Sequence, residues 1–196
     1  MLSRNVGFPE GANPAGEGRL HAEEAVRKAI AEVPGVDDAS ISTTWFPAFG
    51  GFTGKVEVQS KPLLTDAQAM LCAVSSHEIS TLHIPLLAGR FFDDGETMRA
   101  AHLVVVNETF VKQYLPDRDP IGQGIRSPML KIDRPSLLIA AGPEEWFQII
   151  GVVGDARNDG LNRPIKPAVF LPHSFVMASD ESLLAKTTPN PDVVLK

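Results

Sequence analysis

The residues of this chain that could do chemistry fall into short groups, and the first of them is Gly151-Val-Val-Gly-Asp155. Two glycines before an acidic residue resemble a phosphate-cradling loop, but the Gly-x-Gly-x-x-Gly spacing is missing and no strong helix pattern follows. We therefore predict a strand that runs into a turn. Asp93, Asp94 and Glu96 could suggest calcium, yet an EF-hand loop spreads its ligands over twelve residues. For 93–96 we predict a solvated polar loop.

The other polar residues also lack the spacing of a complete catalytic or metal-binding motif. A Gly-x-Ser-x-Gly nucleophile elbow is absent from the sequence. Asp155 with Arg157, or Glu144 with Glu145, could form acid–base pairs, but nothing in the sequence fixes their separation. The histidines never occur at the i,i+4 spacing of a helical zinc pair, so we expect structural or surface roles for His21, His77, His83, His102 and His173. We predict no catalytic residue, no metal site and no cofactor.

Composition limits the class of protein. The chain has 196 residues, 43% of them hydrophobic and 21% charged, which is a globular balance. A net charge of −6 gives no broad basic field, so we expect no nucleic-acid partner. Apolar runs are strand-sized and the start lacks the pattern of a signal peptide, so a role outside the cytoplasm would need a further segment to place the domain there. The single Cys72 excludes an internal disulfide and lies in an apolar run, which predicts a buried small hydrophobe.

Helical periodicity is clearest at 20–33. An apolar face is predicted from Ala22, Val26, Ala29, Ile30 and Val33, and the face toward water from Glu23, Glu24, Arg27 and Lys28. Pairs between Glu23 and Arg27 and between Glu24 and Lys28 would add i,i+4 support. The helix should end at Pro34-Gly35.

The other predicted elements are short. We expect a helix at 76–82 with Ser76 as its N-cap, and one at 108–114 that Asn107 caps and Pro116 ends. Strands are predicted at 4–8, 36–44, 55–59, 68–74, 103–106, 121–125, 137–141, 146–153, 168–171 and 183–187. Strands outnumber helices, and two strand-helix-strand units predict an α+β fold with mixed sheets.

One loop is both aromatic and rich in glycine, and it is the part of the sequence that could contact a partner. Its residues 45–54 include three glycines among the aromatic side chains of Trp45, Phe46, Phe49 and Phe52. Such a loop either folds back to cover a small core or presents a contact surface. The sequence leaves both readings open.

Several motifs occur in a fixed order along the chain. Segment 104–125 contains a strand ending in Asn107-Glu108, a helix, and the turn Leu-Pro-Asp-Arg-Asp-Pro-Ile-Gly at 115–122. Segment 75–90 contains a short helix and then His83 followed by Ile-Pro-Leu-Leu-Ala-Gly-Arg. Further pieces are Val-Pro-Gly-Val at 33–36, Ile-Ile-Gly-Val-Val-Gly-Asp at 149–155, Gly-Leu at 160–161 and Lys-Pro-Ala-Val-Phe-Leu-Pro at 166–172.

In this order the motifs resemble the MacB-like periplasmic core domain of FtsX-type ABC transporter permeases over nearly the whole chain. His83 stands where glycine is common in the family. The sequence departs from the family pattern in a long insertion at 127–142, and it contains neither membrane helices nor an ATPase domain. The resemblance implies a porter-like lobe, at about 1–60 and 137–196, with a smaller inserted lobe at about 61–136.

The same resemblance implies a function. It predicts a noncatalytic extracytoplasmic domain between the first two membrane helices of a permease, anchored through them in the inner membrane. ATP hydrolysis in the cytoplasm would move the domain, in efflux or lipoprotein-type transport. Implied partners are those helices and the ATPase, with a periplasmic adaptor or lipoprotein and a second copy in a homodimer. The alternative is a free-standing module that binds a small ligand, and a hydrolase is the weakest reading because no acid, base and nucleophile can be named.

The aromatic loop yields a direct test. If it contacts a partner, replacing Trp45 or Phe49 with Ala should impair transporter assembly or partner binding while the melting temperature of the domain stays unchanged. Differential scanning fluorimetry and a binding assay on the same variants separate the two readings. A parallel loss of melting temperature and binding would favour the packing role.

Overall fold

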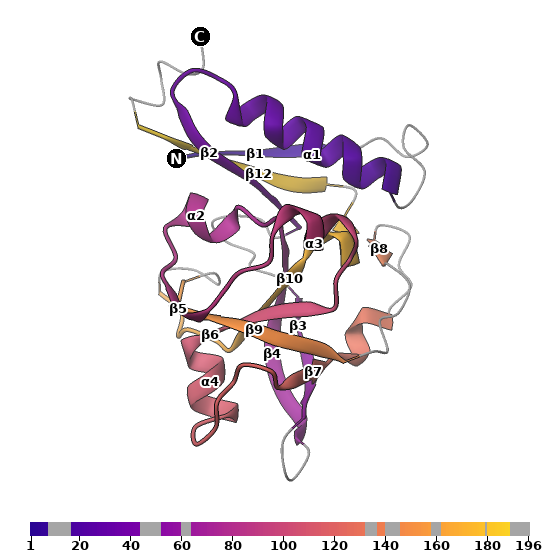
Figure 1. Cartoon of the computed structure of the whole chain (residues 1–196), viewed down its shortest axis with the longest axis vertical. Helices are drawn as coiled ribbons and strands as arrows, with labels where there is room; N and C mark the ends of the chain where they lie inside the picture. Colours follow the sequence, from indigo (N-terminus) through magenta and orange to yellow (C-terminus); the bar gives the residue numbers. More distant parts are fainter. Residues whose placement is uncertain are drawn as a thin grey trace.

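The computed structural model of the protein describes residues 1–7, 17–43, 52–59, 64–131, 137–139, 146–157, 162–178 and 180–188. In these ranges the chain has the predicted α+β fold, with helices packed on a large mixed sheet (Figure 1). The helices are α1 Glu17–Ala31, α2 Glu78–Leu82, α3 Asp94–Met98, α4 Glu108–Tyr114, and the 3-10 turns η1 Pro128–Lys131 and η2 His173–Phe175. The strands are β1 Leu2–Gly7, β2 Val36–Ser42, β3 Phe52–Val58, β4 Leu64–Val74, β5 Leu86–Gly89, β6 Leu103–Asn107, β7 Gly124–Arg126, β8 Leu137–Ile139, β9 Phe147–Val153, β10 Ala168–Pro172, β11 Val176–Ala178 and β12 Asp180–Thr187.

The main sheet closes on itself over most of its width. Its order is β1-β12-β2-β4-β10-β6-β9-β7-β3, and β3 also pairs with β4, so the strands from β4 to β3 form a ring. The pairs β4–β10 and β6–β9 are parallel and the other pairs of the ring are antiparallel. Strands β2, β12 and β1 extend from the ring, and α1 lies across this extension at one end of the molecule (Figure 1).

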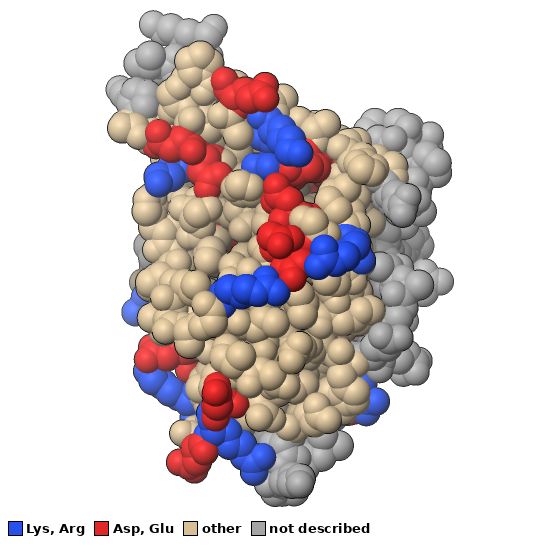
Figure 2. Space-filling view, in the orientation of Figure 1, with Lys and Arg blue, Asp and Glu red and all other residues tan. Residues whose placement is uncertain are grey.

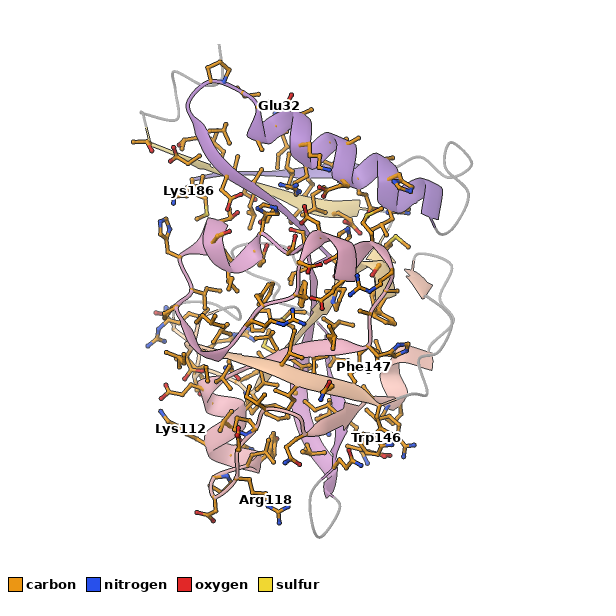
Figure 3. The ribbon with its side chains drawn as sticks, in the orientation of Figure 1. Glu32, Lys112, Arg118, Trp146, Phe147 and Lys186 are labelled. Atoms are coloured by element: carbon orange, nitrogen blue, oxygen red, sulfur yellow. The ribbon has the colours of Figure 1, made fainter. Side chains whose placement is uncertain are left out.

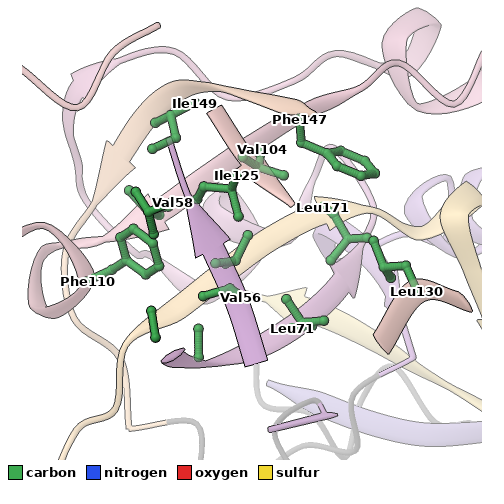
Figure 4. Close-up of a cluster of buried hydrophobic side chains, with 14 of the residues drawn as sticks. Val56, Val58, Leu71, Val104, Phe110, Ile125, Leu130, Phe147, Ile149 and Leu171 are labelled. Carbon is green, nitrogen blue, oxygen red and sulfur yellow. The ribbon is translucent and has the colours of Figure 1, made fainter. Parts of the chain in front are cut away.

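Apolar side chains fill the inside of the ring at alternate positions, as the period of a strand requires. Val56, Val58, Val104 and Ile149 are among the buried side chains of this cluster, and Phe110 of α4 packs with them (Figure 4). The intervening residues of β4, β6 and β10 form a second cluster with α2 and the chain after β5, which includes Cys72. The prediction that Cys72 is a buried small hydrophobe is confirmed, and burial raises the pKa of its thiol to about 12.

A buried amide joins four segments of the ring. The Oδ1 atom of Asn107 accepts from the backbone N–H of Phe110, at 3.0 Å, and of Ala168, at 2.8 Å. Its Nδ2 group donates to the Asp155 carboxylate, at 2.7 Å, and to the carbonyl of Lys166, at 3.0 Å. The predicted N-cap of the helix at 108–114 is confirmed, and the same side chain also ties β6 to β10 and to the end of β9.

The orientation of α1 differs from the sequence prediction. The helix begins at Glu17 rather than at residue 20, and its buried stripe contains charged side chains. Glu23 is 0% exposed and Arg27 is 4% exposed, so the prediction that both face water is wrong. Periodicity identifies the apolar residues of a helix but does not identify charges that find partners inside the fold.

The predicted ion pairs on α1 are correspondingly rearranged. Glu23 pairs with Arg19 at 2.7 Å, whereas Arg27 pairs with Glu24 at 2.6 Å, so the predicted Glu23–Arg27 pair does not form. The predicted pair between Glu24 and Lys28 is present at 3.4 Å.

Two short segments also differ from prediction. Helix α2 begins at Glu78 after His77, with no side-chain cap, so Ser76 is not its N-cap; the Ser76 hydroxyl donates to Asp94 instead. Residues 93–96 are not a polar loop, since α3 begins there with a capping box between Asp93 and Glu96. The Asp-x-x-Glu spacing at 93–96 is the helix-start signal that distinguishes this segment from a loop.

The other predicted elements are present to within a few residues, and α4 agrees at both ends, whereas β5, β11, η1 and η2 were not predicted. The division into lobes at about 1–60 with 137–196 and at about 61–136 stays a prediction. Within the described ranges, every helix is too short or too polar to cross a lipid bilayer.

The Asn107 junction predicts a large effect from one substitution. Replacing Asn107 with Ala should lower the free energy of unfolding by about 2–4 kcal/mol, because two buried N–H groups and the Asp155 carboxylate lose partners. Urea denaturation of wild type and variant gives the difference. The same substitution at Asn5, which is exposed on β1, is the matched control and should cost less than ~0.5 kcal/mol. Equal losses at the two positions would contradict a special role for Asn107.

Candidate functional site

The predicted partner contact lies mostly beyond the described ranges. Trp45, Phe46 and Phe49 are outside the described residues, and Phe52 is the first residue of β3, where its backbone lies opposite Leu71. The partner-contact role of the aromatic loop therefore stays a prediction.

The polar residues around Asp155, which were candidates for acid–base chemistry, have structural roles. The Asp155 carboxylate accepts from the backbone N–H of Thr109 at 3.0 Å and from its hydroxyl at 2.7 Å, in addition to Asn107. Arg157 is exposed and donates to the carbonyl of Arg163 at 3.2 Å. Asp155 thus caps the start of α4, although it lies far from that helix in the sequence. The structure does not bring Asp155 together with Arg157 as an acid–base pair. Glu144 and Glu145 lie outside the described residues.

The glycines of 151–155 serve strand packing. A Cβ atom on Gly151 would lie 2.2 Å from the carbonyl oxygen of Arg90, and one on Gly154 would lie 2.7 Å from Pro85 Cγ. Both positions therefore need glycine so that the chain around β5 can approach β9. This agrees with the prediction of a strand that runs into a turn.

The acidic residues at 93–96 are likewise engaged in local structure. Asp93 accepts from the backbone N–H of Glu96 at 2.7 Å, and Glu96 accepts from the backbone N–H of Asp93 at 3.1 Å. Arg90 adds two hydrogen bonds of 2.7 Å to Glu96, which lowers the pKa of that carboxyl. Among the described residues, no group of three or more His, Cys, Asp or Glu side chains is placed to hold a metal ion.

The histidines occupy varied positions. His173 is buried, His102 packs against Phe147 and Phe175, and His21 and His83 are exposed. His83 ends α2 with φ at 56°, a left-handed conformation that favours glycine. This explains physically why glycine suits the position. His77 lies between two carboxylates.

A layer of charged side chains lies beneath α1. Glu23 is held between Arg19 and the ring of His173, whose Nε2 atom lies 3.5 Å from Glu23 Oε2. Burial raises the pKa of Glu23 and lowers the pKa of His173 to about 4, so the buried histidine is neutral at neutral pH. Figure 2 shows the outer part of this region, where acidic and basic side chains lie together over α3. The α1 layer is therefore polar, in contrast with the apolar interior of the ring.

Strand β5 carries two of the exposed large apolar residues of the described chain. Leu86 is 44% exposed and Leu87 is 52% exposed, and the nearby Ile121 is 36% exposed. Ile121 is near β5 because its Cδ1 atom lies 3.0 Å from where a Cβ atom on Gly89 would be. Adjacent exposed leucines on a short strand form an apolar surface that a partner could cover. We call Leu86, Leu87 and Ile121 the β5 surface.

Sequence reasoning did not find the β5 surface. The sequence after His83 predicts a turn, because the two leucines between Pro85 and Gly89 break the alternation expected of a half-buried strand. The charged ends of the molecule are elsewhere: Glu32 and Lys186 lie toward the α1 end, and Lys112 and Arg118 lie at the opposite end (Figure 3). The β5 surface is thus an apolar site on the side of the ring.

Comparison with known proteins gives a consistent result. The model of the MacB-like periplasmic core domain family matches residues 4–194. The periplasmic region of MacB from Actinobacillus actinomycetemcomitans is 13% identical, with a TM-score of 0.57 over 88% of this chain and 69% of that chain. The extracellular domain of the noncanonic ABC-type transporter YknZ from Gram-positive bacteria is 13% identical, with a TM-score of 0.54 over 96% of this chain and 84% of that chain.

No curated protein matches the sequence. The two solved structures establish a shared fold, and the family model covers almost every residue. The resemblance inferred from the order of motifs is confirmed. The chain belongs to the MacB-like periplasmic core domain family of ABC transporter permeases.

Proposed function

We propose that this chain is the noncatalytic extracytoplasmic domain of an ABC transporter permease and couples cytoplasmic ATP hydrolysis to movement outside the membrane. The observation that carries the proposal is the family match over residues 4–194. Membrane helices on either side anchor the domain, and the transporter's ATPase supplies the energy. The transport is of the efflux or lipoprotein type.

The architecture suits mechanical coupling. A closed ring with an apolar interior is stiff, because close-packed side chains resist deformation. Among the described acidic candidates, Asp155, Asp93 and Glu96 are held by helix caps and an ion pair. A stiff body can transmit a displacement from the membrane to a partner at its surface.

The β5 surface is our candidate for that partner contact. An adaptor or lipoprotein, or the second copy in a homodimer, would cover Leu86, Leu87 and Ile121 and remove their apolar surface from water. The aromatic loop at 45–52 is a second candidate surface within the same proposal. A free-standing module that binds a small ligand remains the alternative function.

The coupling proposal is tested by movement, which requires no knowledge of the cargo. In the full-length permease reconstituted with its ATPase in liposomes, we would replace the exposed Asp117 with Cys and attach a fluorophore. The buried Cys72, with its raised thiol pKa, should remain unlabelled. Energy transfer to an acceptor lipid should change when ATP is added.

Two controls define this experiment. A transporter with an inactive ATPase should show no change, and a label at the exposed Lys28 on α1 reports on the opposite end of the domain. If energy transfer from both labels stays constant while ATP is hydrolysed, the coupling role is wrong and the ligand-binding alternative gains support.

The β5 surface gives a separate prediction. In cells that depend on the transporter, replacing Leu86 and Leu87 together with Asp should reduce transporter-dependent growth at least 10-fold, because charges would have to be buried at the contact. The melting temperature of the domain should change by less than about 2 °C, since both side chains are exposed. Replacing both leucines with Met preserves an apolar surface and should preserve growth. Normal growth of the Asp variant at wild-type protein levels would exclude the β5 surface as the contact.

A further inference from the structure

Helix α2 lies at a weak junction of the sheet. Strand β2 connects the extension that carries α1 to the ring, and among the described residues it pairs with β4 at one register position, Ser42 opposite Val74. Hydrogen bonds of Thr43 and Ser75 with neighbouring backbone groups add to this junction. Helix α2 packs against β2 and β12 beside it, so the way α2 is held affects how firmly the extension joins the ring.

The inner face of α2 is polar although it is buried. Glu78 is 4% exposed and Thr81 is fully buried, and the Oε2 atom of Glu78 has no hydrogen-bond partner within the described part of the chain. Ser40 of β2 is the polar side chain that faces the carboxyl group. The carboxyl group therefore lies in a region that stabilises its neutral form.

Glu78 changes charge near neutral pH. Burial raises the pKa of its carboxyl from the usual 4.5 to about 7, and the Ser40 hydroxyl offsets this only in part. From β4 the neighbouring group is the Cys72 thiol, which is neutral because its own pKa is about 12. When Glu78 ionises, a buried charge without a basic partner opposes the packing of α2 on the strands.

The outer side of α2 also contains a group that can bind a proton. His77 Nδ1 lies 2.9 Å from Asp38 Oδ1 on β2, and its Nε2 lies 3.5 Å from Asp94 Oδ1 on α3. A neutral imidazole can donate from one nitrogen, whereas the imidazolium donates from both. Two acceptors on opposite sides of the ring are therefore satisfied together by the protonated form.

Other charged groups surround this arrangement. Arg27 of α1 lies 3.9 Å from Asp94 Oδ2, and Lys28 also acts on the Asp94 carboxyl. Ser80 and Ser76 donate to Asp38 and Asp94. From β12, Lys186 lies opposite Asp38 in register, and Glu181 is buried on the same strand.

We propose that α2 is a proton-controlled clasp that holds β2 and α3 together while the buried Glu78 carboxyl is protonated and loosens when that carboxyl ionises. The ionisable carboxyl group acts on the inner face, and on the outer face the imidazole of His77 bridges Asp38 of β2 and Asp94 of α3. The clasp would control how rigidly the α1 extension is joined to the ring. This inference concerns the domain itself and does not depend on the transport role.

The first test compares wild type with Glu78→Gln over pH. Because the folded-state pKa of Glu78 lies above its unfolded value, its contribution to stability is full below pH 4.5 and is lost as the pH rises to about 7 and beyond. Gln keeps the shape and cannot ionise. Relative to wild type, the folding equilibrium constant of the variant should rise on the order of 100-fold between pH 4.5 and 8, as measured by urea denaturation.

The comparison between the two proteins removes other pH effects. His173, whose pKa is lowered to about 4, makes stability fall as the pH drops from 6.5 toward 4, but wild type and variant share this term. Glu108→Gln on the exposed surface of α4 is the matched control and should follow the wild-type curve. Parallel curves for wild type and Glu78→Gln would overturn the proposal.

A local measurement covers the case in which global stability hides the effect. After correction for intrinsic rates, amide exchange at Thr81 and Ile84 should speed up at least 10-fold in wild type from pH 6 to pH 8, while exchange at Leu115 after α4 stays constant. The increase should disappear in Glu78→Gln. Constant protection of α2, or a carbon-13 NMR titration of Glu78 centred near pH 4.5, would refute the clasp.

Discussion

The buried side chain of Asn107 is the interaction on which the arrangement of the ring depends. It accepts from the start of α4 and from β10, and it donates toward Asp155 and Lys166. A carboxylate could not supply the donors and an alkyl side chain could supply neither function. Because β6 is central in the ring, this amide sets the position of α4, of the segment after β9 and of β10 with one group of atoms.

The two ends of the molecule are stabilised by different kinds of interaction. The ring encloses valine, isoleucine and phenylalanine side chains at alternate strand positions, which gives a close-packed and rigid body. Beneath α1 the buried groups include Arg19, Glu23 and His173, whose stability depends on pairing and protonation. Polar layers of this kind are weaker than apolar cores and respond to pH. The ring is therefore joined to an extension whose stability depends on the protonation of buried groups.

Family membership indicates the class of protein, whereas the contacts in the structure explain the roles of individual residues. The family assigns the chain to the periplasmic parts of ABC transporter permeases. The physical reading explains why its glycines and acidic residues belong to packing: Gly151 and Gly154 permit close approach of the chain around β5, and Asp155 caps α4. It also identifies the leucines of β5, about half of whose surface is exposed to water.

The sequence by itself determined the features that depend on near neighbours. The cap at Asn107, the end of α4 before Pro116 and most strands could be predicted, because caps, proline and apolar runs act over a few residues. The burial of Glu23 and Arg27, the pairing of β3 with β4 that closes the ring, and the exposure of Leu86 and Leu87 were decided by tertiary structure. Each of these three features depends on contacts between segments far apart in the chain. The pattern of neighbouring residues therefore does not indicate which surface another segment covers.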